Sequence, residues 1–197
     1  MYARGSIRGF VVRCVIQATY DVLRSKNVER GSEFWRFSLS LYRMDGVPPS
    51  CIVLQDRHGL DVNIMLFALW LASKGRAISA PDMLQADGLV RGWRVESVVA
   101  LRGVRRYLRD PPLPFAGEAA TALRDKIKVA ELESERLQQE ALFAMRPPEA
   151  WGRTEEPLRA AELNLDACAQ SIGAVFDDGA RRALLAAFHA LVAARTP

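Results

Sequence analysis

The chain has 197 residues, of which half are hydrophobic and a quarter are charged, and its formal net charge is +4. This composition is typical of a globular protein and excludes a disordered one, and the length suits one ordinary domain with an appended helical extension. The longest unbroken apolar run, Ile64 to Ala72, has nine residues. It is too short to span a membrane, which takes roughly 20 residues, so we expect a core helix there and no membrane span.

The distribution of charge and the cysteines bear on the kind of partner and on the redox environment of the protein. Residues 1–115 hold 17 Lys and Arg against 10 Asp and Glu, whereas residues 116–197 hold 10 against 13. A basic front half can steer anionic partners, although a surplus of this size also occurs in proteins that bind nothing anionic. Cys14, Cys51 and Cys168 are widely spaced and form neither a CxxC pair nor a Cys/His cluster. They indicate reduced thiols in a bacterial-type cytoplasm, not a disulfide framework or a zinc site.

Residues 1–30 do not read as part of the domain. Arg4 and Arg8 precede the apolar Phe10-Val11-Val12, as at the start of a signal peptide, but Arg13 interrupts that run and no clear cleavage site follows. We expect this leader to be poorly ordered or to lie upstream of the true start of the protein, with Val28 as an alternative initiator.

The domain proper begins at Ser32, a good N-cap for a helix of aromatic and aliphatic residues that ends before Gly46. Pro48-Pro49 begins a short helix that Gly59 stops. Asp61 then caps a central, nearly all-round hydrophobic helix, Val62 to Ser73, which Lys74 and Gly75 close.

Two further helices are expected before the prolines at 111–112. Pro81 to Ala86 predicts a short helix that ends at Gly88, and a separate amphipathic helix follows Gly92. Residues 118–145 contain no Gly or Pro and predict a long helix in an antiparallel hairpin. Residues 157–172 and 178–194 predict two alanine-rich helices, the last capped by Asp177 or Asp178.

The expected fold is therefore all-α. It is a multi-helix bundle with a central hydrophobic helix, made of a helical core at 32–112 and a C-terminal helical hairpin extension at 116–196, after the leader at 1–30.

Three motifs resemble, in their order, a family of conserved hypothetical bacterial proteins of unknown function. They are Phe34-Trp35-x-Phe37-Ser38-Leu39-x-x-Tyr42, Leu54-Gln55-Asp56-x-x-Gly59-x-Asp61-Val62-Asn63 and Trp70-Leu71-Ala72-x-x-Gly75. The resemblance continues to Trp93 and Arg102-x-x-Arg105-Arg106, and so covers about Glu33 to Arg109. Family members usually begin near the Phe-Trp motif, so the leader at residues 1–30 departs from the family pattern. The resemblance implies no known activity.

A polar cluster lies at the start of the central helix and contains Gln55, Asp56, His58, Asp61 and Asn63. Oxygen and imidazole groups of this kind can bind a cation or a small polar ligand, but the spacing does not match a calcium loop. The competing interpretation is structural, because Asp61 caps a helix, Gly59 ends one, and Gln55, Asp56 and Asn63 can tie the junction through backbone hydrogen bonds.

Enzyme motifs are lacking in the sequence. There is no GxSxG, no Ser/His/Asp arrangement and no phosphate-binding loop, and the two histidines are His58 and His189. We lean against an enzyme and expect no cofactor and no metal.

Five arginines form the strongest candidate for binding: Arg94, Arg102, Arg105, Arg106 and Arg109. The last four follow i, i+3, i+4 and i+7 spacing and so share one helix face, where guanidinium groups can grip carboxylates or phosphates in bidentate fashion. Alternatively, they pair with acidic residues of neighbouring helices, such as the stretch Glu131 to Glu140. Nucleic acid is not expected, because exposed aromatics and a stronger basic balance are missing.

The leading hypothesis is a non-enzymatic interaction or adaptor module that binds an unknown protein partner through the arginine face and the long helix. The alternative is a helical protein that binds a small ligand or a metal, conceivably an enzyme, centred on the cluster from Gln55 to Asn63. The sequence leaves the oligomeric state open.

Overall fold

The structure is a computed structural model that describes residues 31–194. The prediction for residues 1–30, including Val28 as an initiator, lies outside the described residues. The first helices are α2 (Glu33–Tyr42), α3 (Val47–His58) and α4 (Val62–Ser73), followed by α5 (Ala80–Trp93), the π-helix η2 (Arg94–Val99) and α6 (Ala100–Tyr107). The rest of the chain forms α7 (Glu118–Met145), the short 3₁₀ helix η3 (Pro148–Ala150), α8 (Pro157–Ser171) and α9 (Asp178–Ala193).

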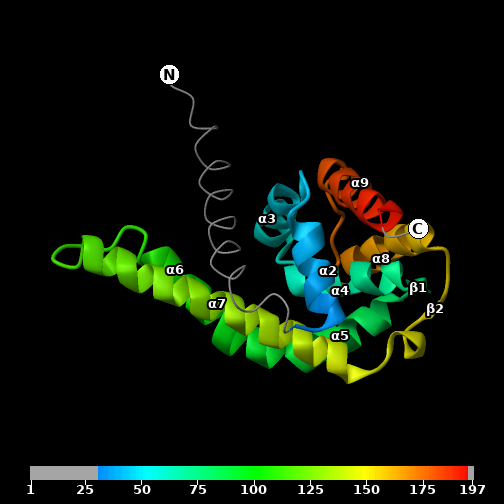
Figure 1. Cartoon of the computed structure of the whole chain (residues 1–197), viewed down its shortest axis with the longest axis horizontal. Coiled ribbons are helices and arrows are strands. Elements are labelled where there is room, and N and C mark those ends of the chain that lie inside the picture. Colours follow the sequence, from blue (N-terminus) through cyan, green and yellow to red (C-terminus); the bar gives the residue numbers. More distant parts are fainter. Residues whose placement is uncertain (1–30, 195–197) are drawn as a thin grey trace, which may run out of the picture.

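Helix α4 forms the centre of the body and packs against α2, α5, α7 and α8, while α9 packs against α2, α3 and α8 (Figure 1). All ten residues from Asn63 to Ala72 are buried, because neighbours cover the helix on every side. Phe67 and Trp70 contact the rings of Phe34 and Trp151 in edge and tilted arrangements that suit aromatic quadrupoles. The predicted all-α bundle with a central hydrophobic helix is therefore confirmed.

A small β-ribbon, absent from the sequence prediction, joins the segment that follows α4 to the segment that precedes α8. Strand β1 (Arg76–Ala77) pairs antiparallel with β2 (Arg153–Thr154), so that Arg76 lies opposite Thr154. Gly152 precedes β2 with φ +47°, and a Cβ there would lie 1.9 Å from the carbonyl oxygen of Ala77. The close approach of the two backbones therefore requires glycine at this position.

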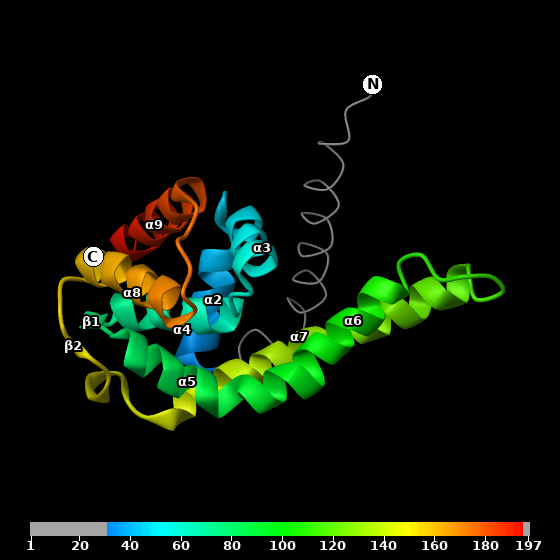
Figure 2. The same ribbon diagram turned by 180° about the vertical axis from the view of Figure 1, so that it is seen from behind.

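Helices α5, η2 and α6 run end to end and lie beside α7, which returns antiparallel to them (Figure 1, Figure 2). We call this unit, residues 80–145, the hairpin. Its distal part, formed by α6, the connection 108–117 and the first half of α7, projects away from the body in both views. Among residues 31–194, no helix has the length and apolar character needed to cross a membrane.

The prediction of a helix end at Gly88 and a new helix after Gly92 is wrong. Both glycines lie inside α5, and neither adopts the left-handed conformation that ends a helix. Ser79 and Asp82 form a capping box that fixes the start of the helix. Glycine weakens a helix by about 1 kcal/mol relative to alanine but does not break it, and packing against α7 and α8 stabilises α5 across both positions.

The π-helix η2 keeps one side of this long helix against α7. Residues that face inward recur in steps of four at positions 86, 90, 94, 98 and 102, where Ala86, Val90 and Val98 are buried and Arg94 and Arg102 are partly buried. In a regular α-helix each step of four drifts by about 40°, so this series would wind around the axis. The wider π turn reverses the drift and returns Arg102 to the side that faces α7.

Candidate functional site

A group of charges that we call the charged seam joins α6 to α7: Arg102, Arg105, Glu131 and Glu135. Arg102 donates from Nε to Glu131 Oε1 at 3.0 Å and from Nη2 to Glu135 Oε1 at 2.7 Å. Arg105 donates to both oxygens of the same Glu131 carboxylate. The Glu131 side chain is 8% exposed, so the two guanidinium groups hold a carboxylate that has lost nearly all of its water.

The seam extends into the polar cluster through Gln55. Arg102 donates its third hydrogen bond from Nη1 to Gln55 Oε1 at 2.8 Å, which ties α6 to the end of α3. Burial raises the pKa of Glu135 to about 7, because the loss of solvation and the neighbouring Glu131 outweigh the attraction of Arg102. The hydrogen-bonding groups of Arg102, Glu131 and Glu135 are thus used by contacts within the chain.

Asp61 connects the hairpin to the central helix. Its Oδ1 accepts a hydrogen bond from the Asn63 backbone N–H at 2.9 Å and so caps α4. Its Oδ2 accepts from Arg94 Nη1 at 2.9 Å and from Gln138 Nε2 at 2.6 Å. One carboxylate thus holds α4, η2 and α7 together, and the predicted capping role of Asp61 is confirmed.

Two amide side chains and a second carboxylate complete this junction. Asn63 is buried, donates to Gln138 Oε1 at 3.3 Å and accepts from Gln139 Nε2 at 2.7 Å. Arg94 also pairs with Asp87. Burial opposes ionisation of Asp87, but the hydrogen bonds from Arg94 and Arg91 hold the pKa of its carboxyl below the ordinary value.

The five predicted arginines separate into two groups. Arg94, Arg102 and Arg105 are partly buried in ion pairs, so pairing with the acidic stretch of α7 is confirmed for Arg102 and Arg105. Arg106 is 58% exposed and approaches Asp56 at 3.7 Å. Arg109 is exposed and has no ion-pair partner within the described part of the chain. The helix therefore turns its arginines in two directions, and a single free arginine face does not exist.

The five polar-cluster residues do not converge on one point. Gln55, Asp61 and Asn63 bond to the hairpin as described above, whereas Asp56 is exposed and His58 lies beside Phe176, with 6.1 Å between ring centroids. Among residues 31–194 no group of three or more His, Cys, Asp or Glu side chains is placed to hold a metal ion.

The sequence offered the stretch Glu131 to Glu140 only as an alternative set of partners for the arginines, and the contacts of Gln138 and Gln139 with Asp61 and Asn63 were missed. The α7 half of this network comprises Glu131, Glu135, Gln138 and Gln139. Their positions follow the three-and-four spacing of a single helix face. A polar face with helical spacing, set against the arginines of another helix, is the signal that could have identified them.

The side of α5–η2–α6 turned away from α7, which we call the outer face, has the opposite character. None of the residues of α6 is buried. Large apolar side chains on or beside the outer face are 45–60% exposed: Leu84, Leu89, Val95, Val99, Val104 and Tyr107. Gly88, Gly92 and Gly103 lie among them, and a Cβ at any of the three would meet no atom within 4 Å.

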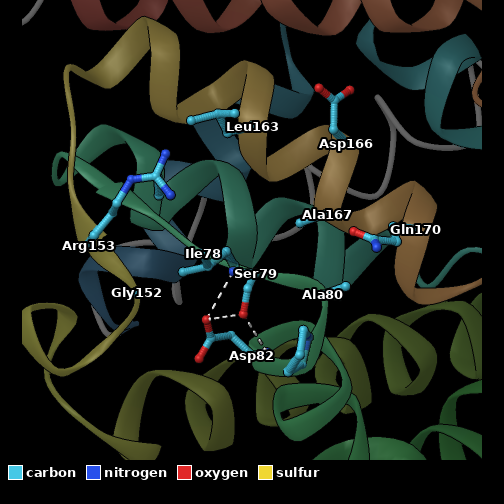
Figure 3. A pocket seen from close by; sticks show the side chains of 12 residues that line it. Ile78, Ser79, Ala80, Asp82, Gly152, Arg153, Leu163, Asp166, Ala167 and Gln170 are labelled. Atoms are coloured by element: carbon cyan, nitrogen blue, oxygen red, sulfur yellow. Dashed lines mark hydrogen bonds between the residues drawn. The ribbon is translucent and has the colours of Figure 1, made fainter.

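A groove of about 480 Å³ lies between the start of α5, β2 and α8. Figure 3 shows Ser79 and Asp82 close together, hydrogen-bonded to each other in the capping box, with Arg153 and Asp166 lying apart from them and from each other. Its central polar groups are satisfied and do not converge on a common point, so the groove has the chemistry of a helix start and not that of a ligand site.

The fold and its charged seam define an all-α protein with a projecting helical hairpin. The family model described as "Protein of unknown function (DUF2390)" matches residues 33–142, which run from α2 through most of α7. This match covers more than half of the chain, so the protein belongs to that family. The prediction of a family of unknown function is therefore confirmed. Neither the search of curated proteins nor that of solved structures finds a match.

Proposed function

We propose that the protein is a non-enzymatic interaction module that binds a protein partner through the outer face of the hairpin. The observation that carries this proposal is the reversed polarity of the hairpin. Paired charges lie between its helices, at Arg102, Arg105 and Glu131, while apolar side chains such as Val99 and Val104 face outward.

The free-energy cost of exposing apolar side chains to water supports an interaction role for the outer face. Apolar surface left in water costs about 25 cal/mol per Å², and a contiguous apolar patch on a protein surface typically marks an interaction site. Tyr107, 60% exposed, adds the aromatic type that is enriched in interfaces. Arg106 and Arg109 keep exposed guanidinium groups toward the distal end of the hairpin, where they can contribute contacts with a partner.

The alternative function, a small-ligand or metal site at the polar cluster, gains no support from the geometry. The oxygen atoms of Gln55, Asp61 and Asn63 already accept hydrogen bonds from Arg102, Arg94 and Gln139, among others. We place the interaction module in a bacterial cytoplasm, and in support of this Cys51 and Cys168 are buried free thiols.

The proposal is tested by placing lysines on the outer face. The double variant Val99→Lys, Val104→Lys keeps the helix, because lysine is a better helix former than valine and both positions are exposed. Cross-linking and affinity purification of the full chain from its native cell should yield a stoichiometric partner with the wild type and at least about tenfold less of it with the double variant.

Val175→Lys is the matched control, because Val175 is 87% exposed and lies between α8 and α9, outside the hairpin. It should retain the partner at wild-type yield. Circular dichroism and thermal unfolding verify that all variants fold. An equal yield of the same partner from the double variant and the wild type would overturn the proposal.

A further inference from the structure

We propose that the partner of the outer face is a second copy of this chain, with the two α5–η2–α6 helices packed antiparallel about a two-fold axis between Trp93 and Arg94. This inference rests on the proposed function, since it names the partner of the same face. It is carried by the order of large, small and charged residues along the face.

The sizes of the side chains complement one another in this register. An antiparallel pair centred between Trp93 and Arg94 places Leu84 opposite Gly103, Gly88 opposite Val99 and Gly92 opposite Val95. Each glycine of one copy thus receives a large apolar side chain of the other. The space at each glycine is open, because a Cβ there would meet no atom within 4 Å.

The charges complement one another in the same register. Arg91 of one copy lies opposite Glu96 of the other, and the two-fold axis repeats the pair. Arg91 is 63% exposed although it also pairs with Asp87 of its own chain. Glu96 is exposed and has no ion-pair partner within residues 31–194. A parallel pairing in register would place Glu96 against Glu96, so the charges select the antiparallel arrangement.

Within residues 31–194, neither the backbone conformation nor the surroundings of the three glycines requires glycine. Gly88, Gly92 and Gly103 all have ordinary helical backbone conformations with negative φ, and glycine inside a helix costs about 1 kcal/mol relative to alanine. Glycine on an exposed helix face lets a second helix approach closely. Both the glycines and the side chains that fill them belong to one face, as an isologous interface requires.

A charge swap tests the register directly. Size-exclusion chromatography with light scattering of the full chain should give a dimer for the wild type. Arg91→Glu alone and Glu96→Arg alone each oppose like charges twice, so each should weaken dimerisation at least about tenfold. An equimolar mixture of the two variants restores both ion pairs in a heterodimer and should recover the dimer. The control Arg182→Glu, an exposed position of α9, should dimerise like the wild type.

The outcomes separate this inference from the proposed function. A wild-type chain that is monomeric throughout the micromolar range, or a mixture that fails to recover the dimer, overturns pairing with a second copy. If the Val99→Lys, Val104→Lys variant nevertheless loses a different captured protein, the proposed function stands while this inference falls. Restoration of the dimer by the mixture supports the inference, because a merely structural effect of either substitution would persist in the mixture.

Discussion

Glu131 is the acidic residue that the hairpin buries most deeply, and its environment explains why Arg102 and Arg105 are not available to a partner. A carboxylate with 8% of its side chain exposed would cost several kcal/mol to ionise in isolation. Two guanidinium groups offset this cost through charge-assisted hydrogen bonds. Removing either arginine would therefore leave a buried charge underpaired and loosen the hairpin, whatever its effect on partners.

Glu135, next to this pair, should make stability depend on pH. Its folded pKa is raised from 4.5 to about 7, chiefly by burial, so the folded chain holds this proton more tightly than the unfolded chain does. The contribution of Glu135 to the free energy of unfolding is fully present below pH 4.5 and is lost as the pH rises through about 7. We expect the free energy of unfolding to fall by about 2 kcal/mol between pH 5 and pH 8 through this group, measured by urea denaturation.

Glu135→Gln cannot titrate and should flatten this dependence. Glu118→Gln, which changes an exposed glutamate at the start of the same helix, should keep the wild-type slope. The pKa of Asp87 lies below its ordinary value of 3.8. This carboxyl therefore does not contribute to the change in stability between pH 5 and pH 8. Parallel pH profiles for the wild type and Glu135→Gln would contradict the assignment.

At the scale of elements, local signals predicted helix boundaries where the signal is a cap. The expected bounds of α4 and α7 match the observed Val62–Ser73 and Glu118–Met145, since Asp61 and the prolines at 147–148 act within one turn of the chain. Gly88 and Gly92 misled the prediction because the contacts that stabilise α5 come from α7 and α8, which are distant in sequence. The π turn likewise depends on how this helix packs against α7. The residue pattern of one helix alone therefore did not reveal it.

Two glycine-to-alanine substitutions should have opposite effects. Gly92→Ala places a methyl group in open space on a helix, so the free energy of unfolding should rise by about 1 kcal/mol in dilute solution. Gly152→Ala forces a side chain onto φ +47° and against the carbonyl oxygen of Ala77, which should cost about 2–4 kcal/mol. Denaturant midpoints measure both. A loss of stability in Gly92→Ala would show that Gly92 is needed within the single chain.

At the scale of the whole molecule, the sequence predicted the central hydrophobic helix and the all-α class, because nine consecutive apolar residues can only be a core. It did not identify which helix pairs with α7. Apolar periodicity shows that a face is covered but does not name the element that covers it. The charged seam was foreseen only as an alternative for the arginines, since a charge pattern alone cannot distinguish an internal pair from an exposed one.

The body and the hairpin should differ in local stability. Every residue from Asn63 to Ala72 in α4 is buried, whereas none of the residues of α6 is. Few buried apolar contacts permit local opening without global unfolding. In amide hydrogen exchange we expect α4 to be protected at least about 100-fold more than α6 in dilute protein, and the protection of α6 to rise with protein concentration as copies associate. Equal protection of α4 and α6 in dilute protein would contradict this difference.

Asp61 gives the position of the hairpin a consequence inside the body. The same carboxylate that caps α4 also accepts hydrogen bonds from Arg94 of η2 and Gln138 of α7. The hairpin therefore cannot tilt relative to the body without disturbing the first turn of the central helix. A partner that tilts the hairpin does work on that turn, and a change that loosens the turn alters the affinity for the partner by the same free energy. The buried central helix is thus thermodynamically linked to the hairpin that projects from the body.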